Sequence, residues 1–113
     1  MKYIKTPIEG LFEMKPQVFG DERGYFFESF KSDEFKEIVA DVDFVQDNQS
    51  SSTKGVLRGL HFQKGDFEQG KLVRVITGKI LDVAVDLRPN SATFGEHYSV
   101  ILDSEKQNMF YVL

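Results

Sequence analysis

The sequence KILDVAVDLR, from Lys79 to Arg88, alternates in a way that defines a β-strand. Successive side chains of a strand point to opposite faces, so every second residue shares a face. One face carries Leu81, Val83, Val85 and Leu87, and we expect it to be core. The other carries Asp82, Ala84 and Asp86. Two carboxylates on that face indicate either solvent or a polar cavity, such as a small barrel encloses, and the pattern leaves both open.

Similar stretches on both sides of this strand indicate an all-β fold. Short runs of β-forming residues alternate with turns and loops rich in glycine and polar residues, as in a sandwich or a closed barrel. The expected turns and loops are Gly20–Gly24, Ser50–Gly55, Gly65–Gly70 and Gly78. The other expected strands are Leu11–Phe19, Gly24–Phe30, Asp43–Ser50, Val56–Gln63, Lys71–Thr77, Phe94–Leu102 and Asn108–Leu113.

One short helix is expected from Ser32 to Val39. Phe35, Ile38 and Val39 recur at helical spacing, and the Ser32 hydroxyl could cap the first turn. The chain therefore reads as strands with a single helical interruption.

Composition limits the classes of function. The 113 residues fit one domain, 1–113. Hydrophobic residues make up 41% of the chain and charged residues 28%, which is typical of a globular protein. Eleven phenylalanines predict a largely aromatic core, and a net charge of −4 argues against a general nucleic-acid binder. There is no cysteine, and we expect no signal peptide, no membrane span and a location in the cytoplasm.

The stretch VLRGLHFQ, Val56–Gln63, is the richest in chemistry. A lone histidine in an apolar strand is more often a packed residue than a catalyst, but Arg58 needs an anion or a carboxylate as its partner. Arg58 and His61 are an odd number of positions apart, so a regular strand would aim them at opposite faces. A bulge or twist at Gly59 would allow both to serve one site.

Three other segments carry groups suited to binding. The amides of Gln46 and Asn48 share a face and suit sugar hydroxyls or a pyrimidine edge. Arg23, at a turn followed by aromatic residues, could grip a phosphate while a ring stacks a base. Lys71, at the start of a strand, could pair with a developing oxyanion. Taken singly, each segment also has an ordinary structural interpretation. The amides could lie on a solvated outer face, Arg23 could belong to an ordinary hairpin, and Lys71 could be a surface lysine without a role.

Taken together, these segments resemble the dTDP-4-dehydrorhamnose 3,5-epimerase family. The resemblance runs from near the N-terminus to the last residue, and its most specific element is the Arg-Gly-Leu-His motif of residues 58–61. The matching stretches are Val18–Gly24, Phe44–Asn48, Val56–Gln63, Gln69–Arg74, Asp82–Arg88 and Ser91–Gly95.

The resemblance implies a cupin-like β jelly roll that forms a homodimer. It implies an enzyme that inverts C3 and C5 of dTDP-4-dehydro-6-deoxy-D-glucose without a cofactor, in dTDP-L-rhamnose biosynthesis. His61 would be the base that removes both protons, and Lys71 would bind substrate. A role for Lys71 in stabilising the enolate is our own addition. The other implied substrate-binding residues are Arg23, Glu28, Gln46, Asp47, Asn48 and Arg58.

The resemblance also implies parts that these 113 residues do not contain. Family members continue past the strand that ends at Leu113, with a tyrosine that donates the second proton and a carboxylate that orients the base. We therefore expect a C-terminally truncated jelly roll and a poor epimerase. Tyr111 stands in the wrong motif to be the missing acid.

Three alternatives follow. The first is a nucleotide-sugar-binding module with little or no turnover, and the second is a ketoisomerase on a related cupin fold. The third, a metal-dependent cupin, is disfavoured because Gln63 stands where such sites have a second histidine, and His97 lies far along the chain. We therefore expect no metal, and a dTDP-sugar as the partner rather than nucleic acid or a membrane.

Overall fold

The computed structural model describes residues 1–61 and 70–113, and their regular structure is almost entirely β-strand. One helix, α1 (Ser32–Ile38), interrupts the strands in these ranges. The strands are β1 (Lys2–Lys5), β2 (Phe12–Lys15), β3 (Phe19–Asp21), β4 (Gly24–Phe26), β5 (Lys71–Arg74), β6 (Lys79–Val85), β7 (His97–Asp103) and β8 (Met109–Val112). The all-β prediction with one short helix is confirmed.

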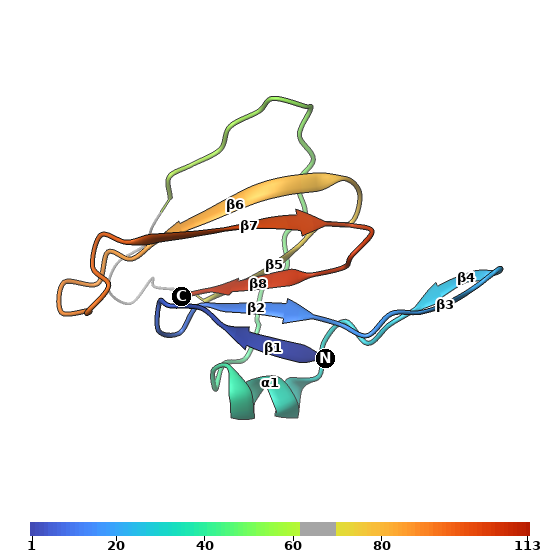
Figure 1. Ribbon diagram of the computed structural model, residues 1–113, viewed down its shortest axis with the longest axis horizontal. Coiled ribbons are helices and arrows are strands. Elements are labelled where there is room, and N and C mark those ends of the chain that lie inside the picture. Colours follow the sequence, from blue (N-terminus) through green and yellow to red (C-terminus); the bar gives the residue numbers. More distant parts are fainter. Residues whose placement is uncertain (62–69) are drawn as a thin grey trace.

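The strands form three antiparallel groups. The largest is a four-stranded sheet in the order β1-β2-β8-β5, and β6 pairs with β7 in a separate two-stranded ribbon. In Figure 1 this ribbon lies above the four-stranded sheet and α1 lies below it. The third group, the hairpin β3–β4, projects sideways from the sheets.

Strand β8 connects two hydrophobic clusters. Phe110 points into the cluster between the sheet and the ribbon, which contains Ile8, Leu11, Val75, Ala84, Val100 and Leu102. Its neighbours Met109 and Tyr111 point to the other face, where Phe35 of α1 packs with Phe12 and Met14. Phe35 and Tyr111 are fully buried. Truncation of a buried phenylalanine such as Phe35 typically costs about 3–5 kcal/mol of stability.

Several expected elements are shorter than their sequence patterns. The expected strand Leu11–Phe19 divides into β2 and β3 around Pro16, which has no N–H for a ladder. The helix ends at Ile38, one residue before the expected Val39. The expected cap at Ser32 is wrong: Lys31 occupies the N-cap without a side-chain bond, and Ser32 is already helical. Gly78 does form the expected turn, with φ at +92°.

The expected core face of β6 is wrong. Leu81 is 67% exposed, and Val83 and Leu87 are also exposed. Ala84 and Asp86, on the opposite face, are buried. Alternation distinguishes two faces, but packing decides which face is buried. Here β7 turns Val100 and Leu102 toward the sheet, so the same side of the ribbon carries Ala84 inward.

The expected strands Asp43–Ser50 and Val56–Gln63 are also wrong within the described residues. The chain from 41 to 61 has no strand pairing there, and almost all of it is exposed. The ring of Phe44 anchors its beginning against Phe35 and Tyr111. A β-strand needs a hydrogen-bonded neighbour, and no described segment lies beside this one as a ladder partner. The end of the second strand and most of the expected loop Gly65–Gly70 lie outside the described residues.

Asp86 closes the loop that joins β6 to β7. Its carboxylate accepts hydrogen bonds from Arg88 Nε at 3.0 Å, Ser91 Oγ at 2.6 Å and Thr93 Oγ1 at 2.6 Å. The hydrogen bonds from these three side chains hold the pKa of Asp86 well below its usual range. The buried carboxylate is therefore fully satisfied and serves as a structural clamp. None of the described helices is long and apolar enough to cross a membrane.

We expect Asp86→Asn to lower the melting temperature at neutral pH and to weaken the acid dependence of stability. A lowered pKa contributes stability above about pH 4, the ordinary value for this group, and that contribution is lost as the pH falls. Thermal melts followed by circular dichroism across the acid range measure both effects. Asp21→Asn is the matched control, because the exposed Asp21–Arg23 pair should contribute little. Equal acid dependence in wild type and Asp86→Asn would contradict this prediction.

Candidate functional site

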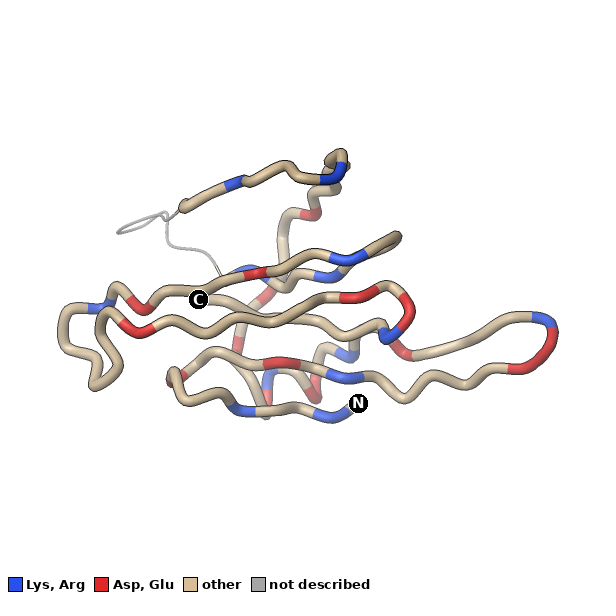
Figure 2. The backbone as a smooth tube through the Cα atoms, turned by 45° about the horizontal axis from the view of Figure 1, so that its top comes forward, with Lys and Arg blue, Asp and Glu red and all other residues tan. Residues whose placement is uncertain are grey.

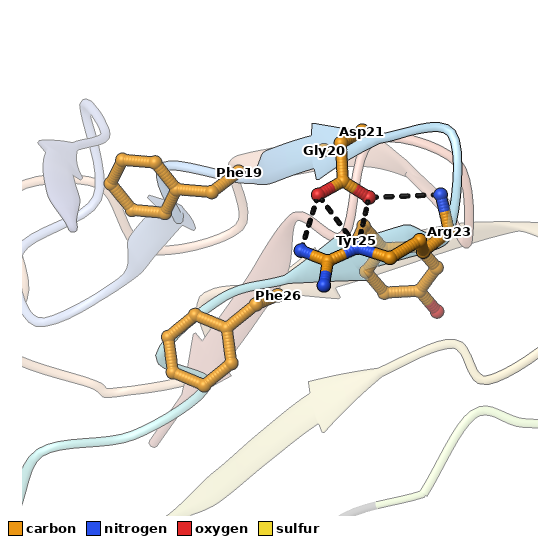
Figure 3. Close-up of a pocket in the computed structure, with 7 residues that line it drawn as sticks. Phe19, Gly20, Asp21, Arg23, Tyr25 and Phe26 are labelled. Atoms are coloured by element: carbon orange, nitrogen blue, oxygen red, sulfur yellow. Dashed lines mark hydrogen bonds and ion pairs between the residues drawn. The ribbon is translucent and has the colours of Figure 1, made fainter.

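Arg23 lies at the turn of the β3–β4 hairpin. Its Nη2 donates to Asp21 Oδ2 at 2.7 Å and its Nε to the same oxygen at 3.2 Å, as Figure 3 shows. These bonds lower the pKa of Asp21 and hold the guanidinium over the hairpin. The side chain of Arg23 is still 87% exposed. The expected turn Gly20–Gly24 is confirmed, and its arginine is accessible to an anion.

Two phenylalanines flank this ion pair. Phe19 and Phe26 are partners in the β3–β4 register, and both are largely exposed. Together with Asp21, Arg23 and Tyr25 they line a shallow hollow on the hairpin, and Figure 3 shows the two rings on the same side. A cation beside exposed rings suits a ligand that carries both a phosphate and a flat base. This agrees with the chemistry expected from the sequence.

A side-chain hydrogen bond to Tyr25 links the hairpin to the turn between β7 and β8. Gln107 Nε2 donates to the Tyr25 hydroxyl at 3.4 Å, and Gln107 is buried in the turn between β7 and β8. The rings of Tyr25 and Phe27 stack with centroids 6.0 Å apart. Acidic and basic residues lie together at the hairpin tip in Figure 2. Because the hairpin projects from the sheets, its charged tip lies away from them.

The segment 41–61 carries the amide and arginine candidates. Gln46 Nε2 donates to Asn48 Oδ1 at 3.3 Å, so these two side chains lie on one side, as expected. Asp47, between them, is exposed. Arg58 Nε donates to Ser52 Oγ at 2.8 Å, and both residues are exposed. No carboxylate pairs with Arg58 in the described ranges, and an anion would satisfy its remaining donors.

His61 follows three residues after Arg58 and is exposed. Gly59 between them has φ at +128°, a conformation that L side chains rarely adopt. The backbone at Gly59 is therefore irregular, but the expected bulge within a strand is not tested, because the described part of Val56–Gln63 forms no strand. The parity argument that places Arg58 and His61 on opposite faces no longer applies.

Lys71 is the first residue of β5, where it is the register partner of Val112 on β8. It shares a strand face with Val73, which packs against the cluster between sheet and ribbon. Asp82, on the inward side of β6, is half-buried, and this burial raises its pKa. The sequence pattern marked Asp82 as facing either solvent or a cavity. The structure shows a partly desolvated carboxylate on the inner face.

The candidate residues fall into separate groups. Gln46, Asn48, Arg58 and His61 belong to one exposed segment, which arches over the top of Figure 1, and Lys71 belongs to the sheet. Arg23 is on the projecting hairpin, and Glu28 is exposed between β4 and α1. No hydrogen bond or ion pair between described residues joins Arg23, Arg58 and Lys71 to one another. Nor do the described residues contain a group of three potential metal ligands. The expected absence of a metal stays a prediction.

Comparison with known proteins links these residues to one enzyme family. The profile of the dTDP-4-dehydrorhamnose 3,5-epimerase family matches residues 5–113. The epimerase of Methanothermobacter thermautotrophicus is 53% identical over 98% of this chain and 60% of its own length. The crystal structure of the Elizabethkingia anophelis epimerase superposes with a TM-score of 0.92 at 50% identity, over 100% of this chain and 62% of that one.

A ligand complex is among the similar structures. The Legionella pneumophila epimerase, in complex with dTDP-4-keto-L-rhamnose, has a TM-score of 0.89 and 47% identity, over 98% of this chain and 59% of that one. This chain thus spans about three fifths of the length of the relatives it matches.

Proposed function

Because this chain belongs to the dTDP-4-dehydrorhamnose 3,5-epimerase family, we propose that the protein inverts C3 and C5 of dTDP-4-dehydro-6-deoxy-D-glucose. The observation that carries the proposal is the family match over residues 5–113, which includes Arg58, His61 and Lys71 together. The cupin-like jelly-roll fold of the family agrees with the strands and single helix described above. We treat residues 1–113 as part of one catalytic domain.

The proposed chemistry needs a base and a cation. The His61 imidazole takes the proton from C3 or C5, and the electron pair of the broken C–H bond moves toward the C4 ketone to give an enolate. The Lys71 ammonium donates to the developing oxygen and lowers the energy of the enolate. Inversion then requires a proton delivered from the opposite face. The family resemblance assigns that step to a tyrosine outside these 113 residues, and no cofactor is required.

The remaining candidates hold the nucleotide sugar. Arg58 is exposed and donates a hydrogen bond to Ser52 rather than to a carboxylate, so its charge is available to the diphosphate. Gln46 and Asn48 offer donors and acceptors to the sugar or the base, and Asp47 and Glu28 add acceptors.

We also propose a cytoplasmic homodimer in which the hairpin of one copy serves the site of the other. The hairpin projects from the sheets, exposes Phe19 and Phe26 and carries Arg23 away from the segment that bears Arg58. In a two-fold dimer each hairpin can lie on the partner, where its rings become buried. Arg23 would then reach the nucleotide bound by the other copy.

We expect Arg58→Ala to weaken dTDP binding by about ten- to a hundredfold. A charge-assisted hydrogen bond to phosphate contributes about 1.5–3 kcal/mol, which corresponds to that change in Kd. Calorimetric titration measures it. Arg74→Ala, which removes the same charge from an exposed position of β5 outside the proposed site, is the control. Equal affinity in wild type and Arg58→Ala would place the diphosphate elsewhere.

We expect the protein to exchange hydrogen for deuterium at C3 and C5 of the 4-keto sugar in deuterated water. His61→Ala should abolish the exchange, because the base is gone, whereas Lys71→Met should slow it by about 10²- to 10³-fold. Nuclear magnetic resonance of the sugar measures exchange and inversion separately. For residues 1–113 expressed alone we expect slow exchange with little inverted product. Binding without any exchange by the natural protein would instead favour the binding-module alternative.

The dimer proposal predicts subunit complementation. Arg23→Ala and His61→Ala should each be nearly inactive alone, but hybrid dimers should contain one intact site if Arg23 acts across the interface. A random equal mixture should therefore recover about a quarter of the wild-type activity. Activity after the two variants are unfolded and refolded together is the measurement, and each variant refolded alone is the control. No recovery despite verified hybrid dimers would show that Arg23 serves its own subunit.

A further inference from the structure

Tyr111 is a fully buried tyrosine at the centre of the four-stranded sheet. On β8 it is the register partner of Phe12 on one side and of Leu72 on the other. Its ring meets Phe35 edge-on with centroids 5.2 Å apart, and Phe44 at 6.5 Å. Backbone pairing and packing on two sides therefore leave this ring little freedom to move.

The hydroxyl of this tyrosine is directed at Gly70. A Cβ built on Gly70 would overlap Tyr111 Oη and come within 2.9 Å of Cζ, closer than the 3.0 Å that real Cβ atoms essentially always keep. Only glycine fits at position 70, because a Cβ there would collide with the Tyr111 side chain and not because the backbone is left-handed. The buried hydroxyl has no hydrogen-bond partner among the described residues. An unpaired buried hydroxyl is unfavourable by itself, so hydrogen bonds among the described residues do not account for its position.

Gly70 is followed directly by Lys71, the first residue of β5. Adjacent Cα atoms are a fixed distance apart, about 3.8 Å, so the position of Gly70 sets where β5 and the lysine begin. We propose that Tyr111 and Gly70 form a steric stop that positions Lys71 for the reaction. This inference rests on the proposed function, in which Lys71 stabilises the enolate. Tyr111 and Gly70 are positioning residues and do not touch the substrate.

The experiment is a pair of substitutions with opposite steric effects, made in the natural protein that contains this chain. Gly70→Ala forces the backbone away from the fixed ring and displaces Lys71. Small displacements of a catalytic group can reduce rates by about a hundredfold. We expect kcat to fall by about ten- to a hundredfold, while the KM and the Kd for dTDP change by less than about threefold, since Arg58 is unaffected.

The rescue separates positioning from general damage. Tyr111→Phe removes the overlapping oxygen, so Gly70→Ala/Tyr111→Phe should have a higher kcat than Gly70→Ala, and Tyr111→Leu in its place should restore more. Met109→Ala is the matched control, because Met109 is buried in the same cluster but belongs to neither the stop nor the site. It should lower the melting temperature and leave kcat per folded site unchanged.

The outcomes are distinct. Two results would overturn the inference: a kcat of Gly70→Ala within twofold of wild type, or a double variant no faster than Gly70→Ala. If Gly70→Ala does not fold, the stop requires that Gly70→Ala/Tyr111→Leu, which removes the ring carbons as well as the oxygen, does fold. An unfolded Gly70→Ala/Tyr111→Leu variant, with Tyr111→Leu alone folded, overturns it as well. A wild-type protein without exchange at C3 and C5 would defeat the proposed function instead. The stop would then be tested by the acylation rate of the Lys71 amine, which Gly70→Ala should change and Met109→Ala should not.

Discussion

Strand β8 pairs with β2 on one side and with β5 on the other, and much of the molecule is arranged around these two ladders. Because neighbouring side chains on a strand point to opposite faces, Phe110 enters the cluster under the β6–β7 ribbon while Tyr111 enters the cluster over α1. A shift of one residue in this register would exchange the two faces, so both hydrophobic clusters depend on it.

The same ladders determine which parts of the candidate site are held in place. Lys71 begins β5 and is fixed by its pairing with β8 and by the contact between Gly70 and Tyr111. The segment that carries Arg58 and His61 is secured at its beginning by Phe44 and by the Lys36–Asp43 ion pair. Farther along, the side-chain hydrogen bonds of Gln46 and Arg58 stay within the segment. Ordering such a chain segment costs conformational entropy. In the proposed function, therefore, the anion bound by Arg58 helps to assemble the site around a lysine that is already in place.

Several features could be predicted because their causes are local in sequence. The Gly20–Gly24 turn, the helix that begins at Ser32 and the turn at Gly78 all depend on residues within a few positions. The motifs themselves identified the family that the comparisons then showed. In the site, Gln46 and Asn48 do lie on one side, as expected, although their segment is not a strand and a direct hydrogen bond holds the two amides together.

The errors concern interactions between distant segments. Strands were expected at 43–50 and 56–63, but a strand exists only beside a second segment, and none of the described segments pairs with 41–61. Alternation in β6 separated two faces correctly, yet Val100 and Leu102 on β7 decided that the Ala84 side is buried.

By itself the sequence determined the all-β class, the local turns and the chemical inventory of the site, because each depends on composition or on neighbouring residues. Only the tertiary structure decided which face of the ribbon is core, that Arg23 projects on a hairpin, and that Gly70 must be glycine because Tyr111 lies against it. These features depend on which distant residues come into contact. Contact between residues 41 positions apart cannot be read from the neighbours of either one.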